Sequence, residues 1–195
     1  MTSQVPDTIS FSDTEFAITA VDGSGLFDPR AHGYHPAGFG SACWRGSICA
    51  YALRDGRLVL DSVLLGPPED GRTPPVLFGV RPRHTRHWAG SGNGYAGLRA
   101  PVPFTGRLLG GAGPVSLGYL NMGFRPAWLF DRVIEFGLEA GRLITSRDRC
   151  AEAAALRSRL GTAGLGPAGA EDAGGWVDRT FSLDFGYSLP TPPTS

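Results

Sequence analysis

The sequence contains no lysine, because all 18 basic residues of its 195 are arginine. Without an ε-amine, the chain can form neither a Schiff base nor the lysine contact of a phosphate-binding P-loop. It also lacks any apolar run of about 18 residues, the length of a membrane-spanning helix. The start, Met1 to Asp7, has no basic segment followed by an apolar one, so we expect no signal peptide.

Cysteine is scarce, and acidic residues balance the arginines. Three cysteines, an odd number without a signal peptide, are typical of reduced thiols, so we predict a cytoplasmic protein. The formal net charge of zero gives no bulk attraction to polyanions. We therefore expect neither a nucleic acid nor a membrane as partner.

The residues that are present suit one globular domain. Hydrophobic residues make up 42% of the chain, and the high glycine and proline content predicts many turns and short elements. We predict a single domain over 15–189, flexible tails at 1–14 and 190–195, and a mobile linker at 161–175 within the domain.

The strongest local signal is a hairpin. The β-prone runs 47–54 and 57–65 flank Asp55-Gly56, a pair that suits a type I′ turn because both residues tolerate positive φ. Few polar positions interrupt either face after the turn, so we expect this hairpin to lie inside a sheet and not at its rim.

Alternation predicts further strands. We expect them at 16–21, 76–80, 102–109, 115–124 and 177–189. The Gly-Gly-Ala-Gly-Pro run at 110–114 should separate strand 102–109 from strand 115–124. Residues 22–41 and 81–99 are rich in glycine and proline or in charge, and we interpret both as long loops. The one predicted helix is 148–160, with Asp148 as its N-cap.

Residues 127–146 fit two periods. Apolar residues recur at helical spacing, but the alternation from Phe130 to Leu138 also fits a strand. Glycine in the middle of a helix costs about 1 kcal/mol relative to alanine, whereas a hairpin turn favours it. Because Gly141-Arg142-Leu143 repeats the turn sequence Gly56-Arg57-Leu58, we predict a second hairpin, 131–138 and 142–146. The predicted fold is mainly β: an antiparallel barrel or sandwich of about eight to ten strands with one helix in the C-terminal half.

The four histidines form two pairs of equal spacing, each in a predicted loop. His32 and His35, together with His84 and His87, could complete a tetrahedral zinc site. Two histidines three apart in a loop carry little specificity, and no thiol or acidic ligand lies nearby in sequence. We therefore predict no metal and no other cofactor, and keep this site as an alternative.

Aromatic and polar residues on the strands suggest ligand contacts. Trp44 could stack on a ligand while Arg45 pairs with its carboxylate, although a core tryptophan with a structural ion pair fits the same residues. Tyr119 and Asn121 share a strand face and could hydrogen-bond a ligand if that face lines a cavity. From the two predicted loops we add Tyr34, His35, Arg86 and Trp88 as ligand-binding candidates.

No catalytic residue can be assigned. The sequence has no Gly-x-Ser-x-Gly, Gly-x-Gly-x-x-Gly or His-Glu-x-x-His motif. Asp131, Glu135 and Glu139 carry carboxylates for acid–base chemistry but belong to no partner motif. We expect Cys49 to be a buried thiol and keep Cys43 as a nucleophile candidate.

Several short motifs resemble a loose family of uncharacterised bacterial β-rich proteins. These are Cys-Trp-Arg-Gly at 43–46, Asp-Gly-Arg-Leu at 55–58, Phe-Thr-Gly-x-Leu at 104–108, Tyr-x-x-Met-Gly at 119–123 and a closing hairpin at 139–144. The resemblance implies a small β-rich protein and no particular activity. It does not extend to 22–41 or 148–189.

Two functional hypotheses follow. The first is a non-catalytic binding module that presents 22–41 and 81–99 to a protein or small-molecule partner. The second is a cofactor-free β-barrel isomerase or cyclase that holds an apolar substrate in an internal cavity. A filled interior beside an exposed apolar patch favours the first, and an enclosed cavity with a few convergent polar groups favours the second. An exposed strand edge could also pair with its copy in a homodimer.

Overall fold

The computed structural model describes residues 3–116, 124–160 and 173–184. Its elements in chain order are β1 (Thr8–Phe11), β2 (Thr14–Ser24), the 3-10 helix η1 (Pro29–His32), β3 (Ser47–Arg54), β4 (Arg57–Leu65), β5 (Arg83–His87), β6 (Gly90–Pro101), β7 (Thr105–Pro114), the 3-10 helix η2 (Ala127–Leu129), β8 (Phe130–Glu139), β9 (Arg142–Asp148), α1 (Cys150–Leu160) and α2 (Ala173–Thr180).

Both predicted hairpins are confirmed. β3 and β4 pair antiparallel around Asp55 and Gly56, whose φ angles of 50° and 71° are those of the expected turn. β3 also pairs with β1, and β4 with β6, so this hairpin lies inside the sheet as predicted. The region 127–146 forms η2 followed by the antiparallel pair β8 and β9.

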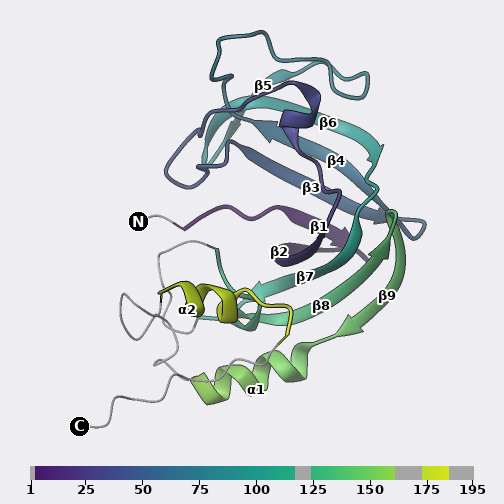
Figure 1. Ribbon diagram of the computed structural model, residues 1–195, viewed down its shortest axis with the longest axis vertical. Coiled ribbons are helices and arrows are strands. Elements are labelled where there is room, and N and C mark those ends of the chain that lie inside the picture. Colours follow the sequence, from purple (N-terminus) through teal and green to yellow (C-terminus); the bar gives the residue numbers. More distant parts are fainter. Residues whose placement is uncertain (1–2, 117–123, 161–172, 185–195) are drawn as a thin grey trace.

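All nine strands join one sheet that curls into a ring (Figure 1). The order is β3-β1-β2-β7-β8-β9-β4-β6-β5, with β3 also paired to β4. β9 meets β4 only at Arg142 and Arg57. The predicted mainly β fold is confirmed. It differs from the prediction in that β1 runs parallel to β3 in an otherwise antiparallel sheet, and in a second helix, α2.

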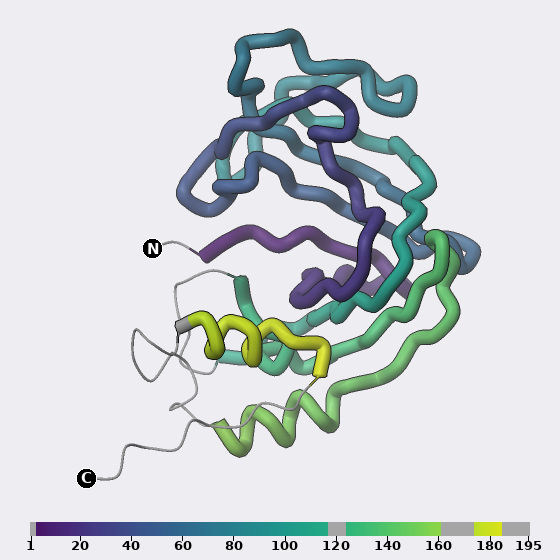
Figure 2. The backbone as a smooth tube through the Cα atoms, viewed as in Figure 1, coloured from purple at the N-terminus to yellow at the C-terminus, as the bar shows by residue number. Residues whose placement is uncertain are grey.

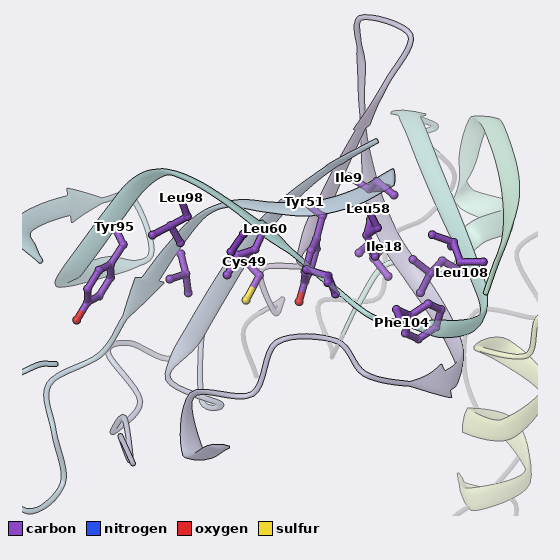
Figure 3. Packing of buried hydrophobic residues seen from close by; sticks show 14 of the residues in the cluster. Ile9, Ile18, Cys49, Tyr51, Leu58, Leu60, Tyr95, Leu98, Phe104 and Leu108 are labelled. Atoms are coloured by element: carbon purple, nitrogen blue, oxygen red, sulfur yellow. The ribbon is translucent and has the colours of Figure 1, made fainter. Parts of the chain in front are cut away.

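The main hydrophobic core fills the inner face of this curled sheet. Large side chains that are almost fully buried come from most of the strands, and Figure 3 shows several of them pointing to the same side. They include Phe16, Tyr51, Tyr95, Phe104 and Phe136. Edge-to-face packing of Phe136 against Phe11 and Phe16 ties β8 to the N-terminal hairpin.

Helices cover only part of the outer face. The predicted helix is confirmed as α1, and the Asp148 carboxylate accepts a hydrogen bond of 2.7 Å from the Cys150 backbone N–H at its start. Leu156 and Leu160 pack with Trp128 of η2 and Val133 of β8 in a second cluster. These elements lie along β8 in Figure 1, and α2 lies beside β2. Among the described residues no helix covers the outer face from β6 to β1.

The prediction of a long loop at 81–99 is wrong, because these residues form β5 and most of β6. The glycines that suggested a loop are needed for close packing. A Cβ on Gly92 would lie 2.3 Å from the Leu65 carbonyl oxygen, and one on Gly94 would lie 2.2 Å from the Thr85 hydroxyl. Strand pairing therefore requires glycine here.

Three more boundaries differ from the predictions at the N-terminal side and in the middle. The predicted tail 1–14 contains β1, which hydrogen-bonds between β2 and β3. The predicted strand 76–80 is a tight turn closed by Leu77 and Val80. β7 continues through 110–114, where we expected a break, because Gly111 and Gly110 pair on both sides.

At the C-terminal side, Val177 begins no strand. Residues 173–180 form α2, with Trp176 packed against the second cluster. The predicted strand is therefore wrong over 177–184, and its remainder from 185 lies outside the described residues. Of the predicted linker, 173–175 belongs to α2 and 161–172 lies outside the description. The predicted strand 115–124 falls mostly there too. No helix in the described part of the chain is long and apolar enough to cross a membrane.

Candidate binding groove

A row of small side chains crosses the outer face of the sheet. Ala96 of β6 lies opposite Ser62 of β4, which lies opposite Ala50 of β3. The row continues through β1 and β2 to Gly111 of β7, with Thr8 and Ala17 as its other members. Six adjacent strands span five steps of roughly 4.8 Å, or about 24 Å of floor.

This row is the floor of a groove of about 1190 Å³. Larger apolar side chains line it beside the small ones, among them Ile48, Leu64 and Phe130. Glu15 lies on the β2 side, where Thr8 donates a hydrogen bond of 3.4 Å to its carboxylate. The groove is larger than most small-molecule pockets and mostly apolar, so it fits an extended apolar ligand.

β5 forms the opposite wall. Alternation along this strand turns Arg83, Thr85 and His87 toward the groove, with Arg81 before them, and turns His84 and Arg86 to the other face. Neither Arg81 nor Arg83 has an ion pair within the described residues. This wall therefore offers two free guanidinium groups to an anionic ligand.

Trp88 marks the end of the wall, at the turn between β5 and β6. Its side chain is 76% exposed, and its ring lies 5.4 Å from that of His87. The His87 ring is held in turn, because Nδ1 accepts a hydrogen bond of 3.2 Å from the Ala89 backbone N–H. An exposed tryptophan on a braced turn is a natural anchor for a partner.

The two segments that we predicted to present a binding surface meet at this turn. The connection from β2 to β3 extends along the sheet to its β5–β6 end (Figure 2). A Cβ on Gly40 would lie 2.3 Å from the Ala89 carbonyl oxygen, so the two backbones are in direct contact. Ala42, Ala89 and Val5 form a small buried cluster there. Segment 22–41 thus supports Trp88.

Trp44 and Arg45 do not face an internal cavity. Trp44 is 62% exposed. Arg45 donates hydrogen bonds to the Asp7 carboxylate at 2.7 Å and to the Val5 carbonyl at 2.8 Å. Asp7 also accepts one from the Cys49 N–H, so it joins the N-terminal segment to β3. This is the structural ion pair that was the alternative to ligand binding.

Tyr34 also has a structural role, because its hydroxyl makes hydrogen bonds within the protein. Its buried hydroxyl donates to the Gly66 carbonyl at 2.7 Å and accepts from Asn93 at 3.1 Å. Tyr95 donates to the Pro75 carbonyl, and burial beside Tyr34 raises the pKa of Tyr95 to about 12. These hydroxyls bind loops to β6. His35 is exposed, and its carbonyl accepts from the Glu69 N–H.

The histidines do not converge on a metal site. His32 packs between Phe27 and Phe78, with both ring centroids 5.2 Å away. His84 and His87 point to opposite faces of β5. Within the described ranges, no group of three or more His, Cys, Asp or Glu side chains could hold a metal ion.

The cysteines are not activated. Burial raises the pKa of Cys49 well above its usual value and also raises that of Cys43, so both stay protonated thiols near neutral pH. Cys49 is buried as predicted. Cys43, which we kept as a nucleophile candidate, is also buried and donates to the Ser47 carbonyl at 3.4 Å.

Of the predicted ligand-binding residues, Trp88 lines the groove and Arg86 lies on the far face of the same strand. Tyr119 and Asn121 lie outside the described residues. Sequence reasoning missed the groove floor, because its small residues come from six strands. The cluster of arginines at 81–86 was the one local feature of the sequence that indicated the charged wall of the groove. No protein-family model, curated protein or solved structure matches this chain.

Proposed function

We propose that this protein is a non-catalytic binding module whose ligand lies in the outer groove and is anchored at Trp88. The observation that carries the proposal is the pairing of a side-chain-filled interior with an open apolar groove of about 1190 Å³ on the other face of the same sheet. The floor of small residues lets a ligand approach the backbone closely. The free Arg81 and Arg83 favour a ligand that carries an anionic group.

The test is a fluorescence titration with 8-anilinonaphthalene-1-sulfonate, an apolar anion that brightens in apolar surroundings. The wild-type protein should bind the dye, and Ala96→Phe should weaken binding by filling the groove from an exposed floor position. Trp88→Ala should weaken it too. Ala155→Phe, at an exposed position of α1, is the matched control and should change nothing. Equal dye binding by all four proteins would contradict the proposal.

A further inference from the structure

β5 is the last strand of the sheet, and no other described strand pairs with its outer edge. Among the described strands its only neighbour is β6, in a regular register from Arg83 opposite Gly94 to His87 opposite Gly90. No other backbone hydrogen bond within the described part of the chain reaches residues 83–87. Every second residue of such a strand turns its N–H and C=O away from its partner, so β5 offers free backbone groups to another extended chain.

The edge is basic on both faces. Arg83 faces the groove and Arg86 faces the other side, with Arg81 just before the strand. In the described ranges none of the three has an ion pair, although Arg45, Arg54 and Arg107 elsewhere pair with aspartates. The positive charge is therefore local, in a chain whose formal net charge is zero.

This charge pattern selects among possible occupants of the edge. A second copy of β5 would bring arginine and histidine opposite arginine and histidine, which is unfavourable. A single-stranded nucleic acid would use the arginines, but the adjoining groove is lined mainly by small and apolar side chains. A polypeptide with two acidic residues three positions apart can face Arg83 with one and Arg86 with the other, because these arginines lie on opposite faces of the strand. With apolar residues at its other positions it uses the arginines, the backbone edge and the groove together.

We propose that β5 accepts an acidic, extended segment of a partner protein as an additional strand, an inference that rests on the proposed binding function and names its partner. Glutamate or aspartate opposite Arg83 and Arg86 would form charge-assisted hydrogen bonds. Side chains on the groove side near His87 would reach the exposed Trp88 ring. Main-chain hydrogen bonds give such addition its affinity, and the side chains give its specificity.

The test measures fluorescence anisotropy of a labelled seven-residue peptide, blocked at both ends, that has glutamate at its second and fifth positions and valine at the others. Two matched peptides separate the contributions: one has lysine in place of glutamate, and one keeps glutamate but has N-methyl groups on alternate backbone nitrogens. The acidic peptide should bind the full-length protein, and each matched peptide should bind at least about tenfold more weakly. Equal binding of the N-methylated peptide would overturn strand addition.

Protein variants locate the contact. Arg83→Glu/Arg86→Glu should lose the acidic peptide and gain the lysine peptide, which a merely unfolded variant could not do. Arg142→Glu on β9 is the control and should bind like wild type. A protein that binds the dye but not the acidic peptide overturns strand addition and leaves the groove proposal standing. Tighter binding of a ten-nucleotide oligothymidylate than of the acidic peptide would also overturn it.

Discussion

Among the described strands, β5 and β9 each have an edge that is largely unpaired. The two strands share one packing feature and differ in register and charge. In each, a threonine lies over a glycine of the neighbouring strand. A Cβ on Gly94 would lie 2.2 Å from the Thr85 hydroxyl, and one on Gly137 would lie 2.4 Å from the Thr145 hydroxyl. Both edges are thus fixed closely to the strand inside them.

The edge of β9 is irregular and its charges are paired. Its pairing with β8 shifts at Ile144, a bulge that interrupts the regular edge. Arg147 pairs with Glu152 at 2.8 Å, and Asp148 caps α1. β5 has a regular register and unpaired arginines. A bulge and local ion pairs therefore protect the β9 edge from pairing with another strand. The β5 edge is protected only by its unpaired positive charge. That charge repels a second copy of β5 but is complementary to an acidic partner.

The largest expected effect is on stability at the end of β9. Arg149, which follows this strand, is buried and pairs with Glu135 of β8 and Glu152 of α1. Arg149→Met should lower the free energy of unfolding by about 3 kcal/mol, because it leaves the Glu135 carboxylate, which is only 14% exposed, without its cation. Arg83→Met on β5 should change it by less than about 0.5 kcal/mol. Urea denaturation compares the two, and equal losses would contradict the contrast.

The second effect distinguishes the two glycines. Gly94→Ala should cost about 1–3 kcal/mol, because the Thr85 Cβ also lies 2.9 Å from the added carbon and rotating the hydroxyl gives no relief. At Gly137 the Thr145 Cβ is 3.7 Å away, so rotation suffices and Gly137→Ala should be close to neutral. Thermal denaturation measures both. Thr85→Ala should recover part of the Gly94→Ala loss.

The third effect is on association. Arg83→Thr/Arg86→Thr removes the charges that oppose self-pairing and leaves a regular edge, so this variant should self-associate as concentration rises. Arg142→Thr leaves the β9 bulge in place and should sediment like wild type. Sedimentation velocity over a range of concentrations gives the result. A double variant that sediments like wild type throughout would show that something other than charge guards β5.

The smallest effect concerns pH. Hydrogen bonds from Cys150 lower the pKa of Asp148 below its ordinary 3.8, so its carboxylate stabilises the folded state above pH 3.8, and this stabilisation fades as the pH falls through the lowered pKa. Asp148→Ala should therefore lower the melting temperature at pH 7 and have a smaller effect near pH 3. A constant difference over that range would mean that charge plays no part in the cap.

The sequence predicted elements whose signal is local. Asp55-Gly56 and Ala140-Gly141 turns fixed two hairpins, and Asp148 marked the start of α1. Where packing decides, the predictions failed. Gly92 and Gly94 suggest a loop in the sequence, but in the structure they are the residues that allow Leu65 and Thr85 to pack closely against β6. Residues 173–180 form a helix whose Trp176 packs on the second cluster, a contact that the sequence does not reveal.

Of the two residues predicted from 81–99, Arg86 lies on the other face of β5. The groove itself could be predicted only at Trp88, an exposed aromatic residue. Its floor could not, because Ala96, Ser62 and Ala50 become neighbours only through the register of separate strands. Arg45 showed the converse. An arginine beside a tryptophan suggested a ligand contact, but the guanidinium of Arg45 pairs with the carboxylate of Asp7, 38 residues earlier in the chain.

The most direct test of the account is amide hydrogen exchange of the full-length protein with and without the acidic peptide. If the peptide adds to β5, outward-facing amides of 83–87 should exchange at least about tenfold more slowly in its presence, while amides of β9 should be unchanged. Protection confined to β9, or none at 83–87 despite measured binding, would contradict the assignment of β5 as the accepting edge.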